Sequence, residues 1–128
     1  MNGKYYSLKT DHANRLIRYR HWGDIVPDDI GKVWEVLLED EYFTKNKYNL
    51  LSDYSEGKFV ASSKDVGEII EILTSHKEFL TGKKQAMILD SPLNMALSVL
   101  FERRVRKKVG FIVKVFSTEE AAFKWITS

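Results

Sequence analysis

The middle of the chain most constrains the fold, because a strand pattern and a helix pattern follow each other in it. Residues 48–54 read as a strand, residues 55–64 as a polar loop, and residues 65–73 place apolar side chains at helical spacing. Ser62 and Asp65 have the spacing of a capping box, which predicts the start of the helix. A chain that alternates these two rhythms folds as a sheet covered by helices.

The same alternation continues on both sides of this segment. Further strands are predicted over residues 5–10, 15–22, 85–89 and 111–116. Further helices are predicted from Pro27 to about Asp40, from Pro92 to a stop at Gly110, and near the end of the chain after a capping box of Ser117 and Glu120. The order is ββαβαβαβα. It predicts an α/β fold, with a mixed, mostly parallel sheet, helices packed on it, and the first strand antiparallel at an edge.

Composition narrows the class of protein. The 128 residues, 44% of them hydrophobic, predict a single domain spanning residues 1–128. With 20 Lys and Arg against 18 Asp and Glu, the net charge of +2 argues against nucleic acid as a partner. The sequence has no cysteine, no signal peptide pattern at its start and no apolar run of the roughly 20 residues that a transmembrane helix needs. We therefore expect a soluble, cytoplasmic protein.

Three sequence phrases carry a family resemblance. They are LIRYRHWG at residues 16–23, YNLLSDY at residues 48–54 and VFSTEEAAFKWI at residues 115–126. With the order of elements, they resemble the SpoIIAA-like family, small bacterial domains that are related to STAS domains and are also compared with the CRAL-TRIO lipid-binding fold. The resemblance implies a SpoIIAA-like fold and a non-enzymatic module. What it implies about function is analogy alone.

The loop before the central helix is the position at which STAS anti-anti-sigma factors carry an Asp-Ser-Ser-Gly phosphorylation motif. The corresponding residues here are Ala61, Ser62, Ser63 and Lys64. The two serines match, but Ala61 replaces the acidic residue and Lys64 replaces the glycine. A helix-capping role for Ser62 is therefore favoured over phosphorylation of Ser62 or Ser63, although a phosphate would be well placed at a helix N-terminus.

Two acidic residues with neighbouring serines end predicted parallel strands. Asp53 with Ser55, and Asp90 with Ser91, would lie at the sheet edge where open α/β sheets bind ligands. The two carboxylates could act as a pair if their strands are adjacent, but turns and caps explain them better. A hydrolase built on either one lacks a nucleophile and a base in the same loop. Metal or base roles are also disfavoured for the three histidines, His12, His21 and His76, and we expect no cofactor.

A basic run follows the apolar part of the helix that begins at Pro92. It consists of Arg103, Arg104, Arg106, Lys107 and Lys108. Cations at a helix C-terminus are ordinarily explained by the helix dipole. The alternative is a docking patch for an anionic surface, either a phospholipid membrane or an acidic protein.

The preferred interpretation is a non-enzymatic module that binds a protein partner or a small apolar ligand at the carboxyl edge of the strands. The alternative is a small carrier of lipids or amphiphiles. An apolar cavity lined by residues such as Phe59, Leu97 and Phe101 would distinguish the carrier. The oligomeric state is left open, and a homodimer is compatible with the sequence.

Overall fold

A five-stranded sheet forms the centre of the molecule. The computed structural model describes residues 5–128. The strand order is β1-β2-β4-β6-β7, with β1 antiparallel to β2 and the other pairs parallel. The strands are β1 (Tyr6–Asp11), β2 (Leu16–His21), β4 (Asn49–Asp53), β6 (Lys84–Ile88) and β7 (Ile112–Phe116). This arrangement confirms the predicted mostly parallel α/β sheet with an antiparallel edge strand.

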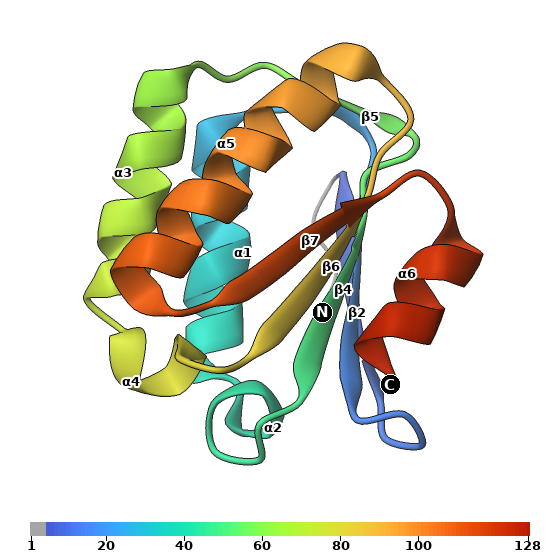
Figure 1. The fold of residues 1–128 in the computed structure, drawn as a ribbon, viewed down its shortest axis with the longest axis vertical. Helices are drawn as coiled ribbons and strands as arrows, with labels where there is room; N and C mark the ends of the chain where they lie inside the picture. Colours follow the sequence, from blue (N-terminus) through green and yellow to red (C-terminus); the bar gives the residue numbers. More distant parts are fainter. Residues whose placement is uncertain (1–4) are drawn as a thin grey trace.

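Helices cover both faces of the sheet, but unequally (Figure 1). On one face lie α1 (Pro27–Glu39), α3 (Ser63–Thr74) and α5 (Pro92–Val109), and on the other lies α6 (Glu119–Ile126). Parallel strands require crossover connections, and the helices supply them. Two one-turn helices were not predicted from the sequence, α2 (Glu41–Thr44) and α4 (Lys77–Leu80). They lie in the connections from α1 to β4 and from α3 to β6, at the lower end of the molecule in Figure 1.

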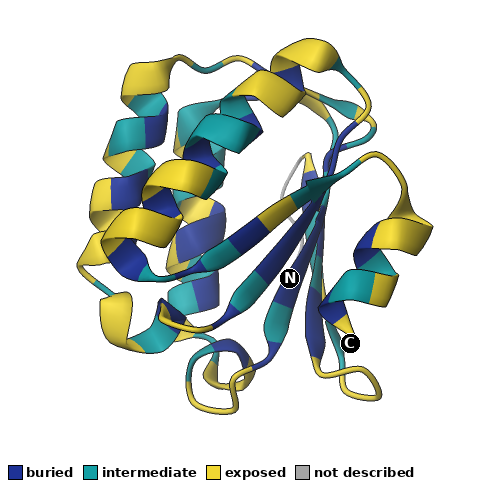
Figure 2. Ribbon diagram, in the orientation of Figure 1, coloured by how far each residue is buried: buried dark blue, intermediate teal, exposed yellow. Residues whose placement is uncertain are grey.

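The sheet separates two apolar clusters. Successive side chains of a strand point to opposite faces, so they contribute to the two clusters in turn. Met87 of β6 belongs to the larger cluster, between the sheet and the three helices, whereas Ala86 and Ile88 belong to the smaller cluster under α6. Figure 2 shows the buried faces of the three helices turned toward the sheet and their exposed faces turned away. The larger cluster is the one that contains the candidate site.

Local chemistry sets most helix ends as predicted. Ser62 and Asp65 form a reciprocal capping box at the start of α3, and the Ser91 hydroxyl accepts a hydrogen bond at the start of α5. Gly110 ends α5 in the left-handed conformation, with a φ of 75°. The predicted cap at Ser117 was wrong. The chain is still extended at Thr118, whose hydroxyl accepts from the Ala121 amide, so α6 begins one residue later.

The predicted polar loop over residues 55–64 contains a strand that the sequence did not indicate. Strand β5 (Gly57–Phe59) pairs in parallel with β3 (Gly23–Ile25) to form a second, two-stranded sheet. Glycine is needed at position 57, because a Cβ there would collide with the Ile25 side chain. Three residues are too few to show a period-2 pattern, which is why these strands were missed.

Candidate functional site

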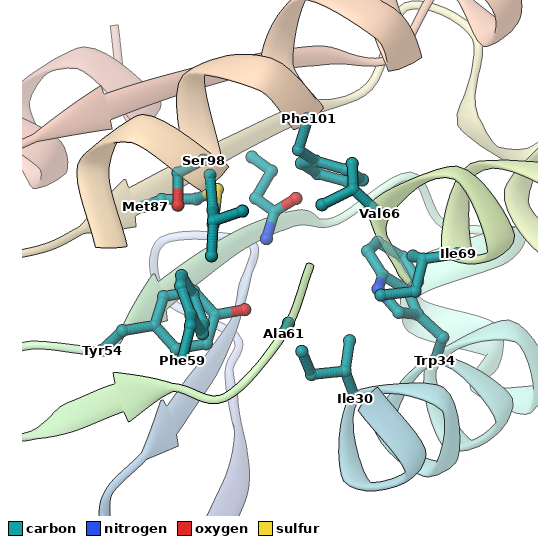
Figure 3. Close-up of a pocket in the computed structure, with 12 residues that line it drawn as sticks. Ile30, Trp34, Tyr54, Phe59, Ala61, Val66, Ile69, Met87, Ser98 and Phe101 are labelled. Atoms are coloured by element: carbon teal, nitrogen blue, oxygen red, sulfur yellow. The ribbon is translucent and has the colours of Figure 1, made fainter. Parts of the chain in front are cut away.

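A cavity of about 50 Å³ lies between the sheet and the three-helix layer. Figure 3 shows its side chains converging from α1, α3 and α5, from the sheet, and from the chain that follows β5. Most of the lining is apolar, including Trp34, Val66, Met87, Leu97 and Phe101. Phe59, Leu97 and Phe101, the three residues for which a cavity was considered from the sequence, all line it.

One wall of the cavity is formed by residues 57–62, which we call the strap. Phe59 and Ala61 of the strap line the cavity, whereas Val60 between them is 50% exposed. The fully buried Asn94 of α5 fastens the strap, since its Oδ1 accepts from the Phe59 amide at 3.0 Å and its Nδ2 donates to the Gly57 carbonyl at 2.9 Å. The strap pairs with β3 and not with the five-stranded sheet.

Two buried polar atoms in the lining have no hydrogen-bond partner within the described part of the chain. They are Oε1 of Gln85, on β6, and Oγ of Ser98, on α5. Both residues are 2% exposed. Buried polar groups of this kind are nearly always hydrogen-bonded in folded proteins. The cavity therefore combines an apolar wall with two polar atoms that have hydrogen-bonding capacity to spare.

A chain of buried side-chain hydrogen bonds leads from the cavity into the core. Gln85 Nε2 donates to Ser52 Oγ at 2.9 Å, and the Tyr54 hydroxyl interacts with both Ser52 and Tyr19. The Tyr19 hydroxyl in turn pairs with Nδ1 of His21. Burial raises the pKa of both tyrosines above the usual value of a phenol, and burial lowers the pKa of His21. These shifts favour the neutral form of each group.

Lys83 is a second unusual group, outside the cavity. It is 6% exposed, its Nζ donates to the carbonyl of Phe43 and, at 2.9 Å, to the carbonyl of Tyr48, and it lies 4.2 Å from the centre of the Phe43 ring. Burial, with a smaller contribution from the nearby charge of Lys47, lowers the pKa of Lys83 to about 8. Both carbonyls belong to the connection between α1 and β4, so Lys83 anchors that connection.

Asp53 and Asp90 have the turn and surface positions that were preferred over a carboxylate pair. Asp53 ends β4 and Asp90 comes after the adjacent strand β6, but Asp53 Oδ1 accepts from the Ser55 amide at 2.9 Å and from the Ser55 hydroxyl at 2.6 Å. Asp90 is exposed, and Ser91 caps α5. Turn and cap roles thus account for Asp53, Ser55 and Ser91. Within residues 5–128, no group of three histidine or acidic side chains is placed to hold a metal ion.

The serines of the loop and the basic run lie outside the cavity lining. Ser62 is occupied as the cap of α3, with its hydroxyl 3.0 Å from the Asp65 carboxylate, and Ser63 is exposed in the first turn. The five cations of the basic run are all exposed on the last turns of α5. Among the ion pairs of the described residues, none involves Arg103, Arg104, Arg106, Lys107 or Lys108.

Sequence reasoning missed the polar residues of the cavity. Gln85 was the one polar side chain within an otherwise apolar predicted strand, a signal that could have drawn attention to it. Ser98 lies one position beyond Leu97 in the apolar stripe of its helix. Asn94 looked like an ordinary residue of a first helical turn, because its partners are 35 and 37 residues away in the chain.

The sheet order, the antiparallel edge strand and the three-plus-one arrangement of helices define a SpoIIAA-like fold, as the sequence resemblance predicted. No protein-family model and no curated protein matches the sequence. Among solved structures, the chain is similar to an uncharacterized protein from the DUF3478 family with a SpoIIAA-like fold, from Shewanella loihica PV-4. The match has a TM-score of 0.60 and 15% sequence identity, and covers 98% of this chain and 97% of that chain. It establishes the fold.

Across residues 5–128, no helix combines the length and the apolar character that crossing a bilayer requires.

Proposed function

We propose that the protein is a non-enzymatic module that binds a small, largely apolar molecule in the cavity between the sheet and α1, α3 and α5. The observation that carries the proposal is the apolar cavity with the two unpartnered polar atoms, Gln85 Oε1 and Ser98 Oγ. Binding sites for small molecules are typically apolar hollows with a few placed polar groups that orient the ligand.

The size of the cavity bears on what it can hold. Its volume of about 50 Å³ is below the roughly 300–1,000 Å³ of ordinary ligand pockets, and about a third of the engineered ~150 Å³ cavity that binds benzene. A ligand of a few heavy atoms fits the present shape. A longer amphiphile requires the strap to move outward, which its three-residue pairing with β3 makes less costly than opening the five-stranded sheet.

A binding role is also supported by the chemistry of the lining. None of the described residues that line the cavity is a carboxylate, an imidazole or an amine. The titratable group of the lining is Tyr54, and burial raises the pKa of its phenol, which makes it a poor acid at neutral pH. The loop carboxylate of Asp53 is engaged by Ser55.

The proposal is tested by native mass spectrometry of the protein purified from cells without denaturation. We expect a bound small molecule on the wild type. The Ala61→Phe variant places a ring at a position that lines the cavity and is expected to lose that molecule. Val60→Phe, a substitution at the exposed neighbouring position of the strap, is the matched control and is expected to keep it. A wild type that carries no ligand, or an Ala61→Phe variant that keeps it, would contradict the proposal.

A second candidate function, docking to an anionic membrane surface, rests on the basic run of α5. Its five cations are exposed and form no ion pair among the described residues. Each such cation near an anionic leaflet contributes about 1 kcal/mol. Sedimentation with vesicles of anionic lipid, compared with vesicles of zwitterionic lipid, measures this binding.

The variant that tests docking replaces Arg103, Arg104 and Lys107 with glutamine. We expect it to lose vesicle binding. A control that removes the same charge elsewhere replaces the exposed Lys32, Lys58 and Lys124 with glutamine, and it should retain binding. Equal binding by the wild type and the Arg103, Arg104 and Lys107 variant would show that the run is merely a solvated helix end.

A further inference from the structure

The orientation of the Gln85 amide decides which atom faces the cavity. Its Nε2 donates to Ser52 Oγ, and an amide nitrogen can donate but not accept. The Ser52 hydroxyl accepts this bond, so its own proton remains available to a neighbouring group such as the Tyr54 hydroxyl. Gln85 is thereby left with a carbonyl oxygen, an acceptor, as its unpartnered atom in the cavity.

Ser98 supplies the complementary capacity from another wall. Its Oγ lies on α5, is buried, and has no partner among the described residues. A serine hydroxyl can donate one hydrogen bond and accept others. The cavity therefore offers a ligand one acceptor, Gln85 Oε1, and one hydroxyl that can donate, Ser98 Oγ. A hydroxyl group of a ligand can both donate and accept, whereas an ether or a ketone can only accept.

The rest of the lining excludes charge. The described residues around the cavity include no Lys, Arg or His that could neutralise a carboxylate or a phosphate, and no Asp or Glu that could neutralise an amine. A charged group buried without a partner costs far more than a hydrogen-bonded neutral one. The apolar remainder of a ligand is accommodated by side chains such as Trp34, Leu97 and Phe101.

We propose that the cavity selects an uncharged molecule that carries a hydroxyl group on a small apolar body, with the hydroxyl hydrogen-bonded to Gln85 Oε1 and Ser98 Oγ. The inference rests on the proposed function, because it names the ligand class of the same cavity. It goes beyond a general preference for apolar molecules, since it predicts that fatty acids and phospholipid head groups are rejected.

The test is a titration of the full chain with three probes of matched shape, followed by the methyl NMR signals of Met87 and Leu97. The probes are 1-butanol, pentane, in which a methyl group replaces the hydroxyl, and butyrate, which carries a charge. We expect 1-butanol to bind and butyrate not to bind. In the Ser98→Ala variant, we expect 1-butanol to bind about tenfold more weakly, a loss of about 1.4 kcal/mol, and pentane to bind with unchanged or higher affinity.

The control is Ser63→Ala, which removes an exposed serine hydroxyl on α3 outside the cavity, and it should leave both affinities unchanged. If Ser98→Ala weakens 1-butanol and pentane equally, or weakens neither, the hydroxyl assignment is wrong while the cavity remains a binding site. Binding of butyrate as tight as that of 1-butanol would overturn the selection against charge. If neither 1-butanol nor pentane binds the wild type, the proposed function itself fails.

Discussion

Lys83 makes the stability of the fold depend on pH. Its pKa is lowered by burial to about 8 in the folded protein, from 10.5, so between these values the unfolded chain binds more protons than the folded one. The free energy of unfolding contributed by Lys83 therefore rises with pH across this window. We predict that the difference in the free energy of unfolding between the wild type and Lys83→Met, measured by urea denaturation, increases between about pH 8 and pH 10. The increase is at most about 1.4 kcal/mol per pH unit.

Lys83→Met serves as the internal reference in this experiment, because other groups titrate equally in both proteins. The same substitution leaves the carbonyls of Phe43 and Tyr48 without their donor, so its absolute stability is not the readout. A difference that stays flat or falls over the window would show that the ammonium is not buried.

Which residue roles could be predicted depended on how far apart in sequence the partners are. Ser62 caps the amide of Asp65, three residues away, and this contact was visible as a spacing. Gln85 bonds to Ser52 across 33 residues, and a contact of that range follows from strand register, which no local pattern gives. The hydrogen-bond partner of Gln85 was therefore beyond sequence reasoning, whereas the apolar lining was partly anticipated through Phe59, Leu97 and Phe101.

At the scale of elements, two glycines with opposite roles give a matched pair of predictions. Gly67 lies inside α3, and a Cβ there would meet no atom within 4 Å. Gly67→Ala should therefore stabilise the protein by up to about 1 kcal/mol. Gly110 has a φ of 75°, and a Cβ there would lie 3.2 Å from Thr81 Cγ2. Gly110→Ala should destabilise by about 1–2 kcal/mol.

Thermal and urea denaturation of the two alanine variants measure both values. If Gly67→Ala is destabilising, the helix is packed more closely at that position than the structure indicates. If Gly110→Ala is neutral, the end of α5 does not require the left-handed conformation.

The strap is attached by backbone hydrogen bonds and by one side chain, that of Asn94. Removing the Asn94 amide leaves the Phe59 amide and the Gly57 carbonyl without their partners, so Asn94→Ala should destabilise by about 2 kcal/mol or more. Hydrogen exchange of the Phe59 amide should speed up more than exchange of the β4 amides. Asn14→Ala, in an exposed turn, should change stability by less than about 0.5 kcal/mol. Equal acceleration in the strap and in β4 would mean that Asn94 acts only on global stability.

Element prediction succeeded where an element was long enough to show its period. The eight principal strands and helices are β1, β2, α1, β4, α3, β6, α5 and β7. They were located within one or two residues, since each is long enough to show a periodic apolar pattern or, for β6, a continuous apolar run. The strands β3 and β5 have three residues each and the helices α2 and α4 have four. Each of these elements is shorter than two repeats of its own period, which is 2 residues in a strand and 3.6 in a helix. Their existence is a consequence of tertiary packing, such as the close approach of Gly57 to Ile25.

At the scale of the whole molecule, the alternation of strands and helices predicts a sheet covered by helices. The preference for right-handed crossovers decides on which face of the sheet each helix packs. The fold then places three helices over one sheet face and one over the other. The three-helix side contains the cavity, because side chains of α1, α3 and α5 meet there over Gln85 and Met87 of β6. Similarity to a solved structure at 15% sequence identity establishes the fold. The proposed class of ligand rests on the unpartnered atoms of Gln85 and Ser98.

The most direct test of the account is where a ligand binds. A methyl NMR titration with 1-butanol reports both apolar clusters in one experiment, because Met87 and Leu97 line the cavity whereas Leu51 and Ile88 lie under α6. The account predicts saturable shifts at Met87 and Leu97 and unchanged signals at Leu51 and Ile88. Shifts of equal size in both clusters, or none at the cavity, would contradict it.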